Sequence, residues 1–314
     1  MKEQVIAMPT VGGLLASVLL LALASYPVTS SAAFPGANGR IAFQGESLAG
    51  DHTQSDVYTV ARDGSRVRRL SDTPNRNELG PAWSPDGARL AFWRTAAPFG
   101  AGSLWVMNAD GSGKRQLTSG VDARDPAWNP AGTRLVYDEV VGRDLYTLRV
   151  SDGLDRRQLT SGPALDFEPA WSPGGRRVAF TRASATGDPG DIFLVDVVTR
   201  VVQRVTSSPA FDHQVAWAPG AGRLVFERDF DQSSAIFTVR PDGTGLRRLT
   251  GAGTGEHFDI APAWAPDGTT IVFGSDRQSF LHELWTMRSD GTGQRRLLGN
   301  LAAALGFPDW QPVR

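Results

Sequence analysis

The residues of this chain best suited to chemistry are carboxylates and histidines that recur shortly before a repeated Pro-Ala-Trp segment. They are Glu78, Asp122, Asp166, Asp212, His213, Glu256, His257 and Asp259. Carboxylate oxygens and imidazole nitrogens are ligands for divalent cations, and a ring of carboxylates also attracts cationic groups. If the fold gathers these side chains, they would hold a divalent cation or a cationic part of a ligand. The ordinary alternative is that Asp and His are common in loops, where they cap turns.

Signatures of several enzyme classes are missing from the sequence. There is no Gly-x-Ser-x-Gly nucleophile elbow and no phosphate-binding glycine loop with a lysine. His282 and Glu283 lack the second histidine of a zinc-protease helix. The absence of cysteine excludes disulfides, thiolate metal sites and thiol nucleophiles. The formal charge of -1 does not favour a nucleic-acid surface or a polybasic membrane patch. We therefore predict no catalytic residues.

A repeat in the sequence predicts the elements that must position these residues. Its fullest form is Pro-Ala-Trp-Ser-Pro-Asp-Gly at 81–87. Its tryptophans are Trp83, Trp128, Trp171, Trp217, Trp264 and Trp310, at intervals of 45, 43, 46, 47 and 46 residues. A period in the forties with four short strands per unit is the signature of a β-propeller. We expect an all-β, six-bladed β-propeller of four-stranded antiparallel blades.

Each unit is interpreted as strands A to D, named from the centre of the ring outwards. The Pro-Ala-Trp stretch is strand A, an apolar run such as 89–93 is strand B, and Asp-Gly turns separate strands C and D. The chain starts with a lone strand B at 40–43 and ends with a lone strand A at 309–310. Pairing these two strands closes the ring and hides two strand edges.

The tryptophans have two interpretations, a packing role or a platform on which sugars stack. A bulky aromatic residue at one fixed position in all six units suits the wedge-shaped space between neighbouring blades. The repetition therefore favours packing.

Loop lengths distinguish the two faces of the predicted propeller. The A–B and C–D turns lie on one face and are short, whereas the B–C and D–A loops lie on the other and carry nearly all the length variation. All four histidines fall on this second side, which we call the long-loop face: His52, His213, His257 and His282. Variable loops on a rigid frame are the usual place for recognition, so we assign binding to this face.

The repeat resembles the WD40-like propeller repeats of the TolB-like family, which carry Pro-Ala-Trp-Ser-Pro-Asp-Gly before an apolar strand. Residues 81–92 match throughout, 108–118 match the outer hairpin, and the resemblance covers about residues 36–314. The resemblance is specific for the repeat and not for a function. TolB itself is a periplasmic protein of the Tol–Pal envelope system with an α/β domain before its propeller. We expect that domain to be missing here, because about ten residues separate the predicted signal from the first strand.

The N-terminus has the pattern of an export signal. Lys2 precedes an apolar run at 11–24, and small residues follow up to Ala33. The run is shorter than the roughly 20 apolar residues of a membrane-spanning helix. We predict a signal peptide at 1–33 and one propeller domain at 34–314; an uncleaved anchor is the alternative.

Together these features predict an exported, non-catalytic binding scaffold, periplasmic or secreted. Its expected partner is an envelope or extracellular protein or a glycan, bound at the long-loop face by a monomer. We expect no nucleic-acid partner, no membrane span after signal removal, and no cofactor apart from the divalent cation considered above. The alternative is a carbohydrate-active enzyme, a metal-assisted lyase or hydrolase with its site at the channel mouth.

Overall fold

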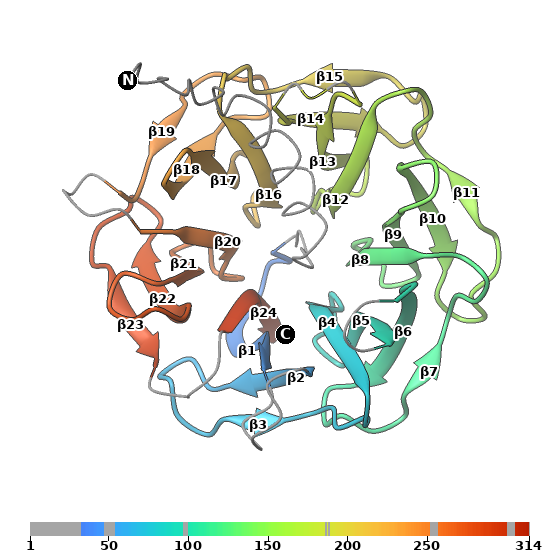
Figure 1. The fold of residues 1–314 in the computed structure, drawn as a ribbon, viewed down its shortest axis with the longest axis horizontal. Helices are drawn as coiled ribbons and strands as arrows, with labels where there is room; N and C mark the ends of the chain where they lie inside the picture. Colours follow the sequence, from blue (N-terminus) through green and yellow to red (C-terminus); the bar gives the residue numbers. More distant parts are fainter. Residues whose placement is uncertain are drawn as a thin grey trace, which may run out of the picture.

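The structure is a computed structural model, and it describes residues 33–46, 54–96, 100–185, 187, 189–251, 257–299 and 305–313. In these residues the chain forms 24 strands, arranged as six antiparallel sheets of four. The sheets surround a central axis as blades (Figure 1). The predicted all-β, six-bladed propeller is therefore confirmed. Ala33 apart, the predicted signal peptide lies outside the described residues, as do His52 and Glu256.

The strands are numbered along the chain, and each blade runs from an inner to an outer strand. The innermost strands are β24 (Leu305–Val313), β4 (Arg76–Trp83), β8 (Ala123–Trp128), β12 (Leu165–Trp171), β16 (Phe211–Trp217) and β20 (Asp259–Trp264). Their neighbours are β1 (Ala37–Glu46), β5 (Arg89–Ala96), β9 (Arg134–Glu139), β13 (Arg177–Ala183), β17 (Leu224–Phe230) and β21 (Thr270–Ser275).

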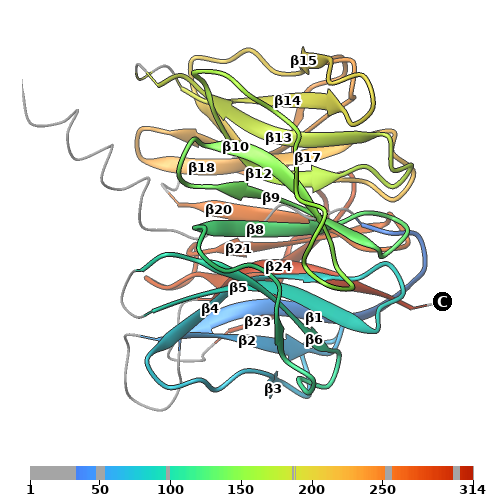
Figure 2. The same ribbon diagram turned by 90° about the vertical axis from the view of Figure 1, so that its right-hand side faces the viewer.

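The two outer strands complete each blade. The third strands are β2 (Ser55–Val60), β6 (Ser103–Asn108), β10 (Asp144–Arg149), β14 (Asp191–Asp196), β18 (Ser233–Val239) and β22 (Glu283–Arg288). The outermost are β3 (Arg68–Arg69), β7 (Arg115–Gln116), β11 (Arg157–Gln158), β15 (Val202–Arg204), β19 (Arg247–Arg248) and β23 (Arg295–Leu298). We number the blades 1 to 6 from the blade that contains β1. In side view the strands of all blades run between the two faces of the ring (Figure 2).

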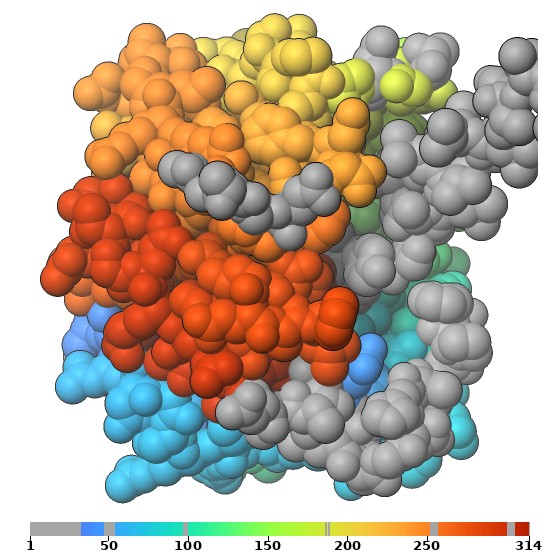
Figure 3. All heavy atoms as spheres, turned by 60° about the vertical axis from the view of Figure 1, so that its left-hand side comes forward, coloured from blue at the N-terminus to red at the C-terminus, as the bar shows by residue number. Residues whose placement is uncertain are grey.

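Blade 1 joins the two ends of the described chain. Strand β24 pairs with β1, with Trp310 opposite Ile41 and Asp309 opposite Ala42. The predicted closure by an N-terminal and a C-terminal strand is thus confirmed. In the space-filling view, blade 6 in red lies between blade 5 in orange and blade 1 in blue (Figure 3).

The core of the propeller lies between blades. One apolar cluster joins Leu70 of blade 1 to Phe92 of blade 2, and another joins Leu145 of blade 3 to Phe180 of blade 4. All six repeat tryptophans are buried, with at most 5% of their surface exposed. Two of them also bond back to the preceding blade, since Trp217 Nε1 donates to the carbonyl of Ala170 at 3.1 Å and Trp128 Nε1 to that of Ala82 at 3.0 Å. The tryptophans are therefore packing residues, and none presents its ring to a ligand.

Every innermost strand contains a bulge that the sequence did not reveal. The register shifts just before each tryptophan, and the residue three positions before it has a φ between 49° and 57°. These residues are Gly80, Asp125, Glu168, Gln214, Ala261 and Phe307. Five of the six are not glycine, and a left-handed backbone is unfavourable for such residues. A bulge redirects side chains, so these positions present theirs differently from a regular strand.

Among the residues that the structure describes, we find no helix with the length and apolarity needed to cross a bilayer.

Candidate functional site

Four of the predicted acidic residues form ion pairs with arginines of the neighbouring strand region. The carboxylates are buried, and each lies 2.5–2.6 Å from a guanidinium nitrogen. The pairs are Glu78–Arg94, Asp166–Arg182, Asp212–Arg228 and Asp259–Arg277. Each pair stays within its own blade, so these acids are neutralised one by one.

The arginines of these pairs also stack on aromatic rings of the third strand. Arg94 lies 3.9 Å from the ring centroid of Trp105, and Arg228 lies 4.7 Å from that of Phe237. Such cation–π contacts favour a partly desolvated guanidinium. Burial raises the pKa of Asp212, and the Arg228 guanidinium opposes that effect. The repeated unit of acid, arginine and aromatic ring thus has a structural role within each of these blades.

The remaining predicted residues that the structure describes, Asp122 and His257, lie in different blades. Asp122 pairs with Arg124 of its own strand region at 3.0 Å, and its Oδ1 accepts a hydrogen bond from the Gly102 amide at 2.7 Å. In blade 6, His257 Nε2 lies 3.3 Å from Asp259 Oδ2. The structure therefore distributes the predicted ligands over several blades. Of those that it describes, only His213 belongs to a group suited to one ion.

His213 lies close to three carboxylates of blades 4 and 5. Its Nδ1 lies 3.6 Å from Glu168 Oε1, and its Nε2 lies 3.5 Å from Glu227 Oε1 and 3.2 Å from Asp229 Oδ2. We call these four residues the His213 cluster. Three of the four are buried, whereas 39% of the Asp229 side chain is exposed and connects the cluster to solvent.

The bulged backbone explains why carboxylates can be buried here. Glu168 Oε2 accepts hydrogen bonds from the bulge amide of Gln214 at 2.7 Å and from the Thr181 hydroxyl at 2.8 Å. Glu227 Oε2 accepts one from the bulge amide of Ala261 at 3.0 Å. Each glutamate therefore uses one oxygen to bond the next blade and turns the other toward His213.

The charges within the cluster shift its proton affinities. Burial lowers the pKa of His213, but the carboxylates of Asp229 and Glu227 outweigh it and hold that pKa well above its usual value. Burial raises the pKa of Glu227 to about 7 against the opposing effect of His213. Burial also acts to raise the pKa of Asp229, yet the nearby imidazolium keeps it below the ordinary value. The surrounding carboxylates thus favour positive charge at His213, which a proton or a bound cation can supply.

A second pair of buried acids lies next to this cluster. Burial, followed by the charges of Asp138 and Glu168, raises the pKa of Asp125 well above its usual value. Burial also raises the pKa of Asp138 to about 6. Buried acidic side chains are therefore concentrated on the inner strands of blades 3 to 5, and their mutual proximity favours the protonated form of Asp125.

The comparisons with known proteins agree on the family. The model of the TolB beta propeller domain matches residues 133–312. The chain belongs to this family. A protein TolB homolog of Chlorobium luteolum is 41% identical over 197 residues, which are 60% of this chain and 43% of that protein. A Tol-Pal system protein TolB 1 of Novosphingobium aromaticivorans is 35% identical over 74 residues, which are 24% of this chain and 16% of that protein.

A solved structure shows the same fold. The TolB of Acinetobacter baumannii has a TM-score of 0.71 and 19% identity, and the match covers 87% of this chain and 67% of that one. The chain spans less than half the length of the curated TolB relatives described above.

Five residues of the inner acidic region of this TolB-type propeller were not predicted from the sequence. They are Asp125, Asp138, Glu168, Glu227 and Asp229. They lie within strands A and B or next to them, whereas the predicted acids lie in front of strand A. One signal was available: the fifth position of strand B carries a charged residue at Asp138 and Glu227, inside strands that are otherwise apolar.

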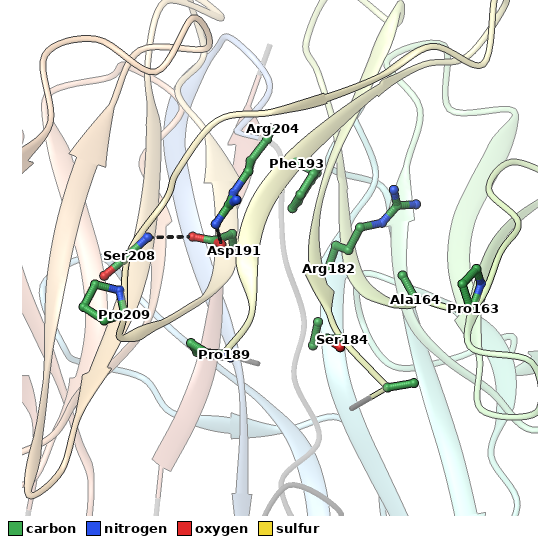
Figure 4. A pocket seen from close by; sticks show the side chains of 12 residues that line it. Pro163, Ala164, Arg182, Ser184, Pro189, Asp191, Phe193, Arg204, Ser208 and Pro209 are labelled. Carbon is green, nitrogen blue, oxygen red and sulfur yellow. Dashed lines mark hydrogen bonds and ion pairs between the residues drawn. The ribbon is translucent and has the colours of Figure 1, made fainter. Parts of the chain in front are cut away.

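A hollow lies at the rim of the long-loop face, in blade 4. It has a volume of about 640 Å³ and is lined by residues that include Pro163, Ser184 and Pro209. Figure 4 shows Asp191 at its wall, held by Arg204 and by the Ser208 amide at 3.1 Å. The charges of its lining are neutralised, because Arg204 pairs with Asp191 and Arg182 pairs with Asp166.

Proposed function

We propose that this chain is an exported, non-catalytic binding protein of the bacterial cell envelope, and that it contacts a partner protein through the long-loop face of the propeller. The observation that carries the proposal is the concentration of exposed aromatic side chains on that face. Variable loops on a rigid propeller are a common place for recognition.

The exposed phenylalanines of the described chain lie on the long-loop face of blades 5 and 6. The exposed fractions are 39% for Phe230, 40% for Phe258 and 106% for Phe280. Aromatic side chains are enriched at protein interfaces, where they bury large areas at low entropic cost. The opposite face carries exposed aliphatic residues in short turns, such as Leu154 and Leu246.

The names of the relatives support an envelope setting. Several curated relatives are called Tol-Pal system protein TolB, and the matched region of each is a fraction of its length. The propeller is the part shared with this chain, so we propose that the partner-binding role resides in it.

The test uses the full chain expressed with its N-terminal segment and purified from the periplasm. Mass spectrometry of the purified protein should give an N-terminus close to Phe34. A photo-crosslinking residue at Phe280 should then trap a defined envelope protein, identified by mass spectrometry.

The matched control places the same crosslinking residue at Leu154, on the opposite face. We expect the partner to be trapped from Phe280 and not from Leu154. Retention of the protein in the cytoplasm, equal trapping from both positions, or binding to a glycan array without a protein partner would contradict the proposal.

A further inference from the structure

We propose that His213 Nε2, Glu227 Oε1 and Asp229 Oδ2 form a binding site for a divalent first-row transition-metal ion such as Zn²⁺. The site belongs to strands β16 and β17 of blade 5, near the centre of the ring (Figure 1). It differs from the ring of carboxylates expected from the sequence, with which it shares only His213. The proposal is independent of the protein-binding role.

The spacing of the three atoms suits a single ion. His213 Nε2 lies 3.5 Å and 3.2 Å from the two carboxylate oxygens, and all three atoms lie within 4.8 Å of one another. In a tetrahedral zinc site with bonds of about 2.0–2.1 Å, neighbouring ligand atoms are about 3.3–3.4 Å apart. The two distances from the imidazole therefore bracket the edge of such a site.

The ligand types select the class of metal. Calcium and magnesium prefer sites made of oxygen atoms alone, whereas an imidazole nitrogen suits zinc and its first-row neighbours. One imidazole and two carboxylates would leave coordination positions for water. The half-exposed Asp229 provides the route by which an ion would enter.

A hydrogen bond holds one of the ligands in place, and a carboxylate lies behind another. Glu227 is fixed through its second oxygen to the Ala261 amide, and Nδ1 of His213 faces Glu168 at 3.6 Å. Glu168 is itself fixed to the Gln214 amide. A carboxylate behind the ligating imidazole orients the ring and increases its basicity, which is the usual arrangement at metal-binding histidines.

An unsatisfied nitrogen is the second observation that points to a ligand. His213 is 9% exposed, and its Nε2 makes no hydrogen bond of acceptable geometry, although it lies near the two carboxylates. Buried polar atoms in native proteins are nearly always satisfied. A metal ion bound to Nε2 would satisfy this atom and both carboxylate oxygens at once. The competing explanation is a plain ion pair between a protonated His213 and the carboxylates, and the experiment distinguishes the two.

The experiment measures metal binding to the full-length protein, free of any histidine tag and stripped with a chelator. Isothermal titration calorimetry with Zn²⁺ and with Ca²⁺ gives affinity and stoichiometry, and visible absorption after Co²⁺ addition reports nitrogen and oxygen ligation. We expect one Zn²⁺ per chain, little affinity for Ca²⁺, and a Co²⁺ spectrum that Zn²⁺ abolishes.

Two variants test the ligands, and two serve as controls. Asp229→Asn should weaken Zn²⁺ binding by about tenfold or more, and His213→Gln should abolish the Co²⁺ spectrum. Asp231→Asn removes the same charge two residues away, and His257→Gln removes a histidine of the next blade; both should bind as the parent does. Circular dichroism confirms that each variant is folded. Absent Zn²⁺ binding, equal affinity for Ca²⁺, or an unchanged affinity in Asp229→Asn would overturn the proposal.

Discussion

Asp309 Oδ2 accepts a hydrogen bond of 2.6 Å from the backbone amide of Trp83. Asp309 lies in the last strand of the chain, and Trp83 lies in the innermost strand of blade 2. The side chain of Gln311 adds a second link, because its Nε2 donates to the Gly87 carbonyl at 2.8 Å. The C-terminal strand thus completes blade 1 by strand pairing and also holds the neighbouring blade through side chains.

Replacing Asp309 by alanine should destabilise the ring. The change leaves the buried amide of Trp83 without its acceptor, which costs about 1–3 kcal/mol of unfolding free energy. Urea denaturation measures the effect. The Asp309→Asn variant keeps an oxygen acceptor and should lose less; an alanine variant as stable as the parent would show that the link is unimportant.

Deleting residues 308–314 should prevent stable closure. The truncation removes Trp310 from the core and exposes the edge of β1, which can then pair with other chains. Light scattering after size exclusion should detect aggregates, and the melting temperature of any remaining monomer should fall. Removal of Arg314 alone is the control. A truncated protein that stays monomeric and as heat-resistant as the parent would contradict the closure by shared strands.

Trp217→Ala should cost about 3–5 kcal/mol, the range for a large aromatic residue removed from a core. The indole is fully buried and also donates to the carbonyl of Ala170 in blade 4. Trp217→Phe keeps most of the apolar volume and loses only the hydrogen bond, so its loss should be smaller. Chemical denaturation of both variants checks the order, and equal losses would argue against a volume effect.

Asp212→Ala should destabilise the protein without changing metal binding. The variant leaves Arg228 mostly buried without its partner, and breaking such a pair costs about 3–5 kcal/mol before the remaining exposure of the arginine reduces it. Calorimetry with Zn²⁺ should give the parent affinity, because Asp212 faces Arg228 and is not a ligand in the proposed site. A weakened Zn²⁺ affinity with unchanged stability would instead assign Asp212 to the ion site.

The buried acid Asp125 should make the protein less stable as pH rises. Its pKa in the folded state lies above its unfolded value of about 4, so the folded state holds the proton more tightly and stability falls from about pH 4 upwards. An asparagine in its place would mimic the protonated form, and asparagine tolerates the positive φ at this position. Asp125→Asn should therefore gain stability relative to the parent at pH 8 and much less at pH 4.5, as measured by urea denaturation.

The control for this titration is Asp63→Asn in an exposed turn. The Ser65 hydroxyl and amide lower the pKa of Asp63, so its contribution is lost only when pH falls through that lowered pKa. Between pH 4.5 and pH 8 this variant should keep a constant difference from the parent. An identical pH profile for both variants would show that burial of Asp125 is not the cause.

The sequence by itself determined the number of blades, the way the ring closes and the packing role of the tryptophans. The apolar strands and the Asp-Gly turns are local patterns that repeat at the period of the tryptophans from Trp83 to Trp310. A closed ring is the arrangement that buries all six tryptophans and pairs the two terminal strands. The long loops and the histidines could be assigned to one face by strand order alone.

Only the tertiary structure decided which ionisable groups meet. The bulge at Glu168 and Gln214 changes the direction of side chains within a strand, and no residue type marks it, since Gly80 and Phe307 occupy the same position. The arginine partners of the acids and the approach of Glu168 to His213 depend on pairing between strands and between blades. The acid–arginine pairs join residues 16–18 positions apart through pairing within one blade. Glu168 and His213 are 45 positions apart and lie in neighbouring blades, so a pattern read along the chain does not show that they meet.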